Sequence, residues 1–244
     1  MQTYKIIKPN IEAVCLNAAE DLLRLAHQCV AENGEFNIAL AGGSTPKKLF
    51  QILASPPFST AIPWGKTHIF FGDERSVAPT HADSNYAMAT KYLFSHINID
   101  PLRIHRIQAE LDPTLAAEAY STVLKAFLPT NNYNQPAFDL ILLGLGDDGH
   151  VASLFPGTDI LNVTDKPVAA VWVASKNTWR ISITLPVINS ASNVWLLVTG
   201  ESKSDIVDQV FKYPSVTQPL PVEMLQPQAG VTWYLDEAAA KWLK

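Results

Sequence analysis

An apolar run from Phe138 to Leu143, interrupted only by Asp139, ends in Gly-Leu-Gly-Asp-Asp-Gly-His at residues 144–150. Hydrophobic residues without polar alternation are typical of a strand covered on both faces, as in parallel sheets. Parallel sheets place their ligand crevices at the carboxyl ends of such strands. This junction therefore predicts a buried strand that delivers His150 to a ligand pocket.

Helix and strand patterns alternate along the rest of the chain. Apolar residues at three- and four-residue spacing predict a helix over 11–32, which Gly34 ends. A strand over 36–40 leads into a glycine turn, after which Thr45 is expected to cap the next helix and Pro46 to begin it. Further strands are predicted at 67–71, 168–174, 179–185, 193–198 and 231–235, and further helices at 84–94, 114–127, 201–211 and after residue 235.

This alternation predicts an α/β fold of a modified Rossmann-like kind, with a mainly parallel central sheet flanked by helices on both faces. The 244 residues contain no clear linker, so we expect one domain over 1–244. The polar stretch 131–136 is expected to be a surface loop.

Charge and cysteine usage limit the class of partner and the compartment. A formal net charge of −5 argues against a nucleic-acid or anionic-membrane partner but leaves room for a small anionic substrate in a basic pocket. Cys15 and Cys29 would lie about 21 Å apart along one helix, too far for a disulfide, so we expect buried thiols. No apolar run of about 18 residues and no signal-type core is present, and a cytoplasmic protein is expected.

Gly144, Gly146 and Gly149 fit the Gly-x-Gly-x-x-Gly pattern of dinucleotide-binding turns. A bound pyrophosphate would face the charges of Asp147 and Asp148, which repel it. Pro156 would also soon break the helix that this pattern requires. The glycines therefore do not predict a nucleotide site.

The segment 146–157, Gly-Asp-Asp-Gly-His-Val-Ala-Ser-Leu-Phe-Pro-Gly, resembles the signature of the 6-phosphogluconolactonases. Leu-Ala-Gly-Gly-Ser-Thr-Pro at 40–46, Phe-Gly-Asp-Glu-Arg at 71–75 with Ser-Asn-Tyr-Ala-Met-Ala at 84–89, and Gly-Val-Thr-Trp-Tyr-Leu-Asp at 230–236 agree with it. The resemblance implies hydrolysis of 6-phospho-D-glucono-1,5-lactone to 6-phospho-D-gluconate in the oxidative pentose phosphate pathway. No cofactor is expected, because a lactone is already activated.

A glycine turn at a helix N-terminus offers backbone amides and hydroxyls that favour a phosphate, and its residues here are Gly42, Gly43, Ser44 and Thr45. The residues alone leave open a plain turn with an ordinary threonine cap. The resemblance favours phosphate binding and adds Arg180 and Lys203 as its cations. Without the resemblance, both would be interpreted as solvated surface side chains.

Asp73 and Arg75 follow a predicted strand and so lie at the expected ligand edge, although an exposed helix-capping cluster is the alternative. Asp73 is a candidate contact to sugar hydroxyls or to the base. Arg75 is expected near the substrate anion or the developing oxyanion, and the sequence does not separate these roles.

His150 is the candidate general base, because imidazole titrates near neutral pH and can take a proton from water. Asp148 could orient or polarise it, or bind substrate hydroxyls, and a capping or core histidine is the alternative. The other five histidines lack such a setting and are expected to be structural or at the surface.

Two other chemistries fit the sequence poorly. A metal site built from Asp73, Asp147, Asp148 and His150 is conceivable, but no His-x-His or His-Glu-x-x-His spacing supports it, so no metal is expected. The Gly-x-Ser-x-Gly elbow of serine hydrolases is also missing. Direct attack by water fits better.

Two rival functions are weighed against lactone hydrolysis. The related glucosamine-6-phosphate deaminases or isomerases carry a glutamate five residues after the histidine, where this chain has Phe155. A sugar-phosphate sensor without catalysis would keep the phosphate loop but would not need Asp148 and His150. In each case the expected partner is a small sugar phosphate, and the expected state is a monomer or a weak homodimer.

Overall fold

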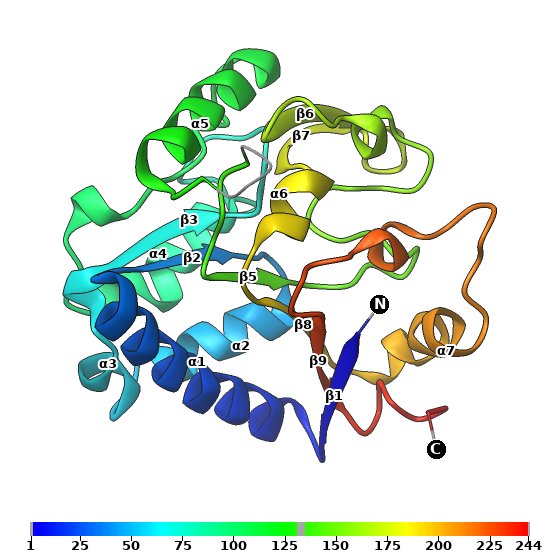
Figure 1. Ribbon diagram of the computed structural model, residues 1–244, viewed down its shortest axis with the longest axis horizontal. Helices are drawn as coiled ribbons and strands as arrows, with labels where there is room; N and C mark the ends of the chain where they lie inside the picture. The colour runs from blue at the N-terminus through cyan, green and yellow to red at the C-terminus, as the bar shows by residue number, and fades with distance from the viewer. Residues whose placement is uncertain (1, 131–134, 244) are drawn as a thin grey trace.

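The computed structural model describes residues 2–130 and 135–243, and the strands within these ranges form two sheets (Figure 1). A six-stranded parallel sheet has the order β1-β9-β8-β5-β2-β3, and a three-stranded antiparallel sheet has the order β4-β7-β6. The strands are β1 (Thr3–Lys8), β2 (Phe36–Leu40), β3 (Thr67–Phe71), β4 (Asp73–Arg75), β5 (Leu140–Leu143), β6 (Val168–Val173), β7 (Thr178–Ile183), β8 (Val194–Val198) and β9 (Val231–Asp236).

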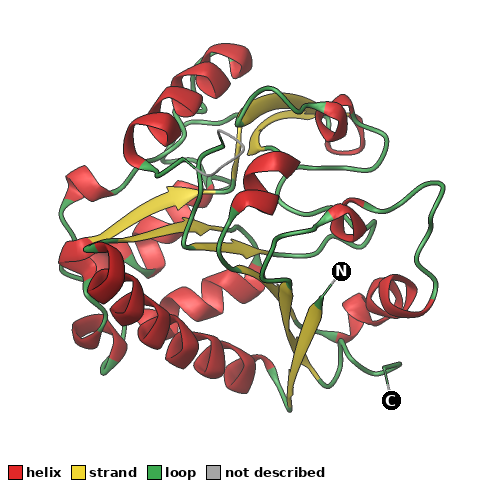
Figure 2. Cartoon of the chain, in the orientation of Figure 1, coloured by secondary structure: helices red, strands yellow, loops and turns green. Residues whose placement is uncertain are grey.

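Helices cover the parallel sheet, as Figure 2 shows by colour. Figure 1 shows α1 and α2 on one side of this sheet, and α5, α6 and the antiparallel sheet on the other. The α-helices are α1 (Ile11–Asn33), α2 (Ser44–Leu53), α3 (Phe58–Ala61), α4 (Asn85–Tyr92), α5 (Pro113–Phe127), α6 (Leu185–Ser190) and α7 (Ser204–Lys212). The predicted α/β fold with a mainly parallel sheet is confirmed, and the loop predicted at 131–136 lies mostly outside the described residues.

The first helix follows the sequence pattern closely. Asn10 accepts a hydrogen bond from the Ala13 amide at its start, and Gly34 adopts φ +84° at its end, where a side chain would be strained. Cys15 and Cys29 lie on its buried face as free thiols, and burial raises the pKa of each to about 12. The expectation of buried, unpaired thiols is confirmed.

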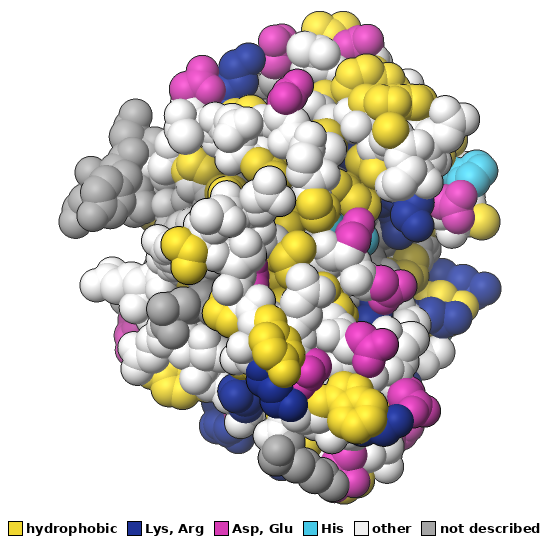
Figure 3. Space-filling model, turned by 90° about the vertical axis from the view of Figure 1, so that its right-hand side faces the viewer, with side chains coloured by type: hydrophobic (Ala, Val, Ile, Leu, Met, Phe, Trp, Pro, Cys, Tyr) yellow, Lys and Arg dark blue, Asp and Glu magenta, His cyan; other side chains and the backbone are white. Residues whose placement is uncertain are grey.

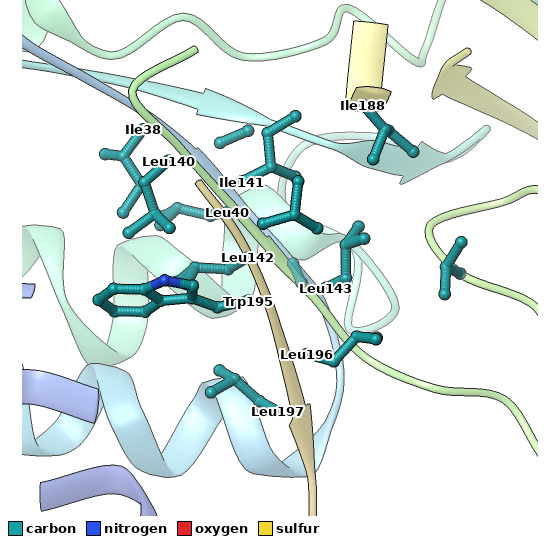
Figure 4. Packing of buried hydrophobic residues seen from close by; sticks show 14 of the residues in the cluster. Ile38, Leu40, Leu140, Ile141, Leu142, Leu143, Ile188, Trp195, Leu196 and Leu197 are labelled. Carbon is teal, nitrogen blue, oxygen red and sulfur yellow. The ribbon is translucent and has the colours of Figure 1, made fainter. Parts of the chain in front are cut away.

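The core centres on strands β2, β5 and β8, whose residues are all buried. Figure 4 shows Leu140 to Leu143 packed among Ile38, Leu40, Trp195 and Leu196. Each buried leucine contributes about 2 kcal/mol of transfer free energy, so the middle of the sheet is held firmly. The loops that leave the carboxyl ends of these strands therefore start from fixed points.

The predicted cap at Thr45 is wrong. Helix α2 begins at Ser44, its N-cap is Gly43 with φ +105°, and no side chain caps it. The Thr45 hydroxyl instead shares a 2.8 Å hydrogen bond with the Thr199 hydroxyl, which follows β8. A partner distant in sequence therefore replaces the local cap.

The predicted closing helix is also absent, because residues 237–242 form turns. The Asp236 carboxylate accepts hydrogen bonds from the amides of Gly200 and Ala239 and ties the tail to the loop after β8. These hydrogen bonds to Asp236 hold the tail in turns, and no local composition reveals them. Strand β1, for which the sequence gives no prediction, pairs with β9 in parallel register at the sheet edge.

The antiparallel sheet was not predicted either. Gly72 ends the run through β3, and residues 73–75, expected only to follow that strand at the ligand edge, form β4 against β7. Asn177, with φ +46°, turns the chain between β6 and β7. The sheet places Arg75 directly opposite Arg180.

None of the helices in the described ranges is long and apolar enough to cross a bilayer. On the face shown in Figure 3, acidic and basic side chains are interspersed and do not gather by sign.

Candidate active site

A cavity of about 220 Å³ opens at the carboxyl ends of the parallel strands. The loops after β2, β5 and β8 form part of its wall, and strands β4 and β7 form another part. It is lined by every predicted site residue except Asp148, namely Gly42, Gly43, Ser44, Thr45, Asp73, Arg75, His150, Arg180 and Lys203. The structure thus brings together segments that are far apart in the sequence.

His150 and Asp148 form a hydrogen-bonded dyad. The imidazole Nδ1 donates to Asp148 Oδ1 at 2.6 Å, which leaves Nε2 as the ring nitrogen available to a ligand. Burial alone would raise the pKa of Asp148, but the hydrogen bonds from the side chain and backbone of His150 outweigh it and hold that pKa below its usual range. Asp148 therefore stays ionised at neutral pH.

The glycines of this loop allow it to fold tightly against His150. The Gly146 amide donates to the His150 carbonyl at 2.8 Å, and the Gly149 amide donates to the Gly146 carbonyl at 3.0 Å. A Cβ added at Gly146 would overlap the His150 ring and the Asp148 carboxylate. Gly149 adopts φ +78°, a conformation that favours glycine. The glycine spacing is thus explained by the folding of the loop onto its own histidine.

Two arginines face each other across the β4–β7 pair. Arg75 Nη1 donates to the Asp83 carbonyl at 2.5 Å and to Asn85 Oδ1 at 2.7 Å, whereas Arg180 Nη1 lies 3.8 Å from Asp73 Oδ2. The Nε atoms of both arginines are buried and have no partner among the described residues. Like charges at opposed positions repel, and two guanidiniums with spare donors suit an anion.

Burial lowers the pKa of the Arg180 guanidinium, an effect that Asp73 opposes and Arg75 reinforces. The Asp73 carboxylate therefore compensates this buried cation only in part. A bound anion would relieve the repulsion between the two guanidiniums.

Asp73 is 6% exposed and already engaged. Ser153 Oγ donates to its Oδ2 at 2.6 Å, and Asn85 Nδ2 donates to its Oδ1 at 3.2 Å and to its carbonyl at 2.9 Å. Neither hydrogen-bonding partner was among the predicted site residues. Asp73 thus links Arg180, and through Asn85 also Arg75, to the segment that follows His150.

The buried Glu74 of β4 supports this wall, because its carboxylate connects β4 to the start of α4. It accepts hydrogen bonds from the amides of Arg75, Asn85 and Tyr86 and from the Ser84 hydroxyl, all at 2.8–2.9 Å. Burial raises its pKa, and these four bonds partly oppose that rise. The sequence signals for Asn85 are its place directly after the predicted cap Ser84, which is confirmed as the cap, and its place in the segment 84–89 that carries the resemblance.

The opposite wall carries the amides of α2 and a lysine. Lys203 ends the short 3₁₀ helix Glu201–Lys203, and its Nζ lies 2.6 Å from Asp147 Oδ1. The first-turn amides of α2 lack acceptors within the helix, so they can serve a ligand. Thr45 is only 5% exposed and its hydroxyl is bonded to Thr199, which leaves its backbone as the group to face an anion.

The four side chains weighed as a metal site point to different partners: Asp73 to Ser153, Asp147 to Lys203, and Asp148 to His150. Among the described residues, no three His, Cys, Asp or Glu side chains converge on a point that could hold a metal ion.

Comparison with known proteins places these features in a family. Residues 9–234 match the family model described as glucosamine-6-phosphate isomerases/6-phosphogluconolactonase. A 6-phosphogluconolactonase of Synechocystis sp. is 41% identical over 89% of this chain and 88% of its own length, and one of Haemophilus influenzae is 40% identical over 86% and 89%. The 6-phosphogluconolactonase structure from Trypanosoma cruzi superposes with a TM-score of 0.89 at 27% identity and covers 100% of this chain and 97% of its own.

Proposed function

The chain belongs to the glucosamine-6-phosphate isomerase/6-phosphogluconolactonase family, and on that premise we propose that it hydrolyses 6-phospho-D-glucono-1,5-lactone to 6-phospho-D-gluconate. This is a step of the oxidative pentose phosphate pathway. One observation carries the assignment to this site: His150, held by its hydrogen bond to Asp148, lines one cavity together with the three cationic side chains Arg75, Arg180 and Lys203. A base beside an anion-binding wall is what hydrolysis of a phosphorylated ester requires.

The substrate is bound through its phosphate. The first-turn amides of α2, at Gly43, Ser44 and Thr45, meet the phosphate together with Lys203 and Arg180. These groups do not take part in bond making. Their role is to hold the lactone carbonyl beside His150, so that binding energy from a remote group orients the reacting centre.

Hydrolysis then proceeds by general-base catalysis. His150 Nε2 removes a proton from water as the water oxygen attacks the lactone carbonyl carbon. The carbonyl electron pair moves onto oxygen, and the resulting oxyanion is stabilised by the Arg75 guanidinium. Collapse of this intermediate breaks the ring C–O bond, and His150 returns the proton to the departing ring oxygen.

Asp148 keeps the imidazole in the required tautomer. Because its carboxylate accepts the Nδ1 proton, the lone pair is on Nε2 before attack. The imidazolium that forms after proton transfer is stabilised by the same carboxylate. Its lowered pKa ensures that Asp148 is charged throughout.

We further propose that residues 1–244 act as one domain in the cytoplasm, as a monomer or weak homodimer, without nucleic acid. The buried free thiols support a reducing compartment. Sedimentation over a hundred-fold range of concentration tests the oligomeric state.

The direct test follows acid release from freshly made lactone, corrected for spontaneous hydrolysis, with wild type and His150→Gln in parallel. His96→Gln, at an exposed position, is the matched control. We expect wild type and control to accelerate hydrolysis, and His150→Gln to lose about a thousand-fold in kcat while still binding 6-phosphogluconate. A wild type without acceleration that still binds the sugar phosphate would favour the sensor, and an active His150→Gln would remove His150 from its role.

A further inference from the structure

The ring of Phe155 stacks on the imidazole of His150. Their centroids are 3.9 Å apart and their planes differ by 22°. Phe155 is only 4% exposed although the histidine beside it borders the cavity. The proposed mechanism gives this phenylalanine no role, yet it makes the closest ring contact of the dyad.

The imidazole is confined from a second direction by Gly146. A Cβ there would overlap ring atoms Nδ1 and Cε1 of His150, so the glycine backbone already lies against the ring. Together with the Asp148 hydrogen bond, these contacts restrict the His150 side chain to one rotamer. Neither packing contact adds a charge or a proton acceptor next to the base.

Phe155 is itself held firmly. Its carbonyl accepts hydrogen bonds from the Thr158 hydroxyl at 2.7 Å and the Thr158 amide at 3.3 Å. Two residues earlier, the Ser153 amide donates to Ser182 Oγ at 3.2 Å, and the Ser153 hydroxyl donates to Asp73. The segment that carries Phe155 is therefore anchored to the antiparallel sheet.

Phe155 also borders a second cavity, which His150 does not line. It lines this cavity of about 690 Å³ with Asp148, Trp172 and Trp179, whereas His150 and Gly146 line the proposed substrate cavity. Water in the second cavity meets the phenyl ring before it reaches the imidazole. The stacked ring thus keeps one face of the base dry.

We propose that Phe155 is a positioning residue that holds the His150 imidazole, with Nε2 toward the substrate, by stacking on it and shielding it from the second cavity. The inference rests on the proposed function, because it concerns the orientation of the same general base. A base displaced by about 1 Å from its working position can lose about a hundred-fold in rate, so rigid support of the ring has a direct kinetic consequence.

Phe155→Leu tests this, because it keeps an apolar side chain but removes the flat ring. Phe138→Leu is the matched control: Phe138 is equally buried and stacks edge-on with Phe70, but it does not line the substrate cavity. We expect Phe155→Leu to lower kcat about ten- to a hundred-fold with KM within two-fold of wild type, and Phe155→Tyr, which keeps the ring, to restore kcat. Phe138→Leu should lower the melting temperature and leave kcat unchanged.

A second readout separates positioning from general destabilisation and does not need turnover. In ¹⁵N and ¹³C NMR spectra, the His150 ring signals of Phe155→Leu should move or broaden relative to wild type, because the ring then samples several rotamers, while Phe138→Leu should match wild type. An unchanged kcat in Phe155→Leu, or an equal loss in Phe138→Leu, would overturn the inference. If wild type fails to hydrolyse the lactone, the proposed function falls, and the NMR comparison alone decides the role of Phe155. Phe155→Met replaces the leucine variant if that variant does not fold.

Discussion

The two ends of the parallel sheet carry the same kinds of side chain but differ in how these are paired. At the amino end, His68 Nδ1 lies 2.9 Å from His105 Nε2, and Glu35 and Arg103 complete a mutually bonded group. His105 also stacks on Phe70 at 4.4 Å. Each of these polar side chains is paired with another of the group.

At the carboxyl end, some hydrogen-bonding groups of these side chains have no partner among the described residues. His150 uses one ring nitrogen, and Arg75 and Arg180 keep buried Nε atoms without partners among the described residues. Histidine, carboxylate and arginine thus occur at both ends. What distinguishes the candidate active site is that His150 and three cationic side chains line one cavity, and residue type alone does not reveal this.

The strongest test of this difference neutralises one carboxylate at each end of the sheet. Asp148→Asn should lower kcat about a hundred-fold or more, because the amide no longer fixes the Nδ1–H tautomer, while the melting temperature stays the same. Glu35→Gln, its counterpart beside His68, should leave kcat unchanged and cost less than about 1 kcal/mol of stability. Rates of lactone hydrolysis and thermal unfolding measure both, and a loss of activity in Glu35→Gln would contradict the contrast.

The next test compares the loss of an asparagine beside the cavity with the loss of one away from it. Asn85→Ala removes the acceptor of Arg75 and the donor to Asp73, so kcat/KM should fall about ten- to a hundred-fold. Asn193→Ala, which loses a 2.9 Å bond to the Asp139 carbonyl before β8, should weaken folding without changing kinetics. Comparable kinetic losses in both variants would show that Asn85 acts only through stability.

The pH dependence of stability should come from the amino end. Burial lowers the pKa of His105 to about 4, and His68 and Arg103 act in the same direction. The unfolded chain takes up this proton near its ordinary value of 6.5, so the stabilisation is complete above that pH and is lost as the pH falls towards 4. The loss should be about 3 kcal/mol.

Denaturant unfolding at pH 7 and pH 4.5 measures this loss, with His105→Gln beside His96→Gln. Only His105→Gln should flatten the curve over that interval, while its activity at neutral pH remains that of wild type. If instead the exposed His96 accounts for the slope, burial is not its cause.

Much of the carboxyl end was predictable because the signals there are local. The apolar residues Leu140 to Leu143 predict β5 as a fully buried strand, and the glycines and His150 follow its end. The loops after β2 and β8 could then be expected at the same edge, since parallel strands end together. This expectation is enough to bring His150 and the first residues of α2 to the same cavity.

The remaining features depend on partners far apart in the sequence. Thr45 bonds to Thr199 and so gives up its local cap, and Asp236 ties the tail to Gly200 in place of a closing helix. Asn85 acquires its role only because β4 leaves the main sheet and pairs with β7. Propensity and periodicity describe neighbours along the chain, and they carry no information on such contacts.

The smallest predicted effect concerns Lys203, the cation at the cavity whose partner is most exposed. Asp147 is 77% exposed at its side chain and holds Lys203 Nζ at 2.6 Å, so it competes with a bound phosphate for this charge. Asp147→Asn should lower KM about two- to three-fold at low salt, and the difference should vanish at high salt, because exposed pairs are weak and screened. Glu110→Gln, which breaks the Arg106 pair away from the cavity, is the control and should leave KM unchanged. A raised KM in Asp147→Asn would mean that Asp147 positions Lys203 for the substrate, which would extend to this wall the kind of support that Asn85 gives to Arg75.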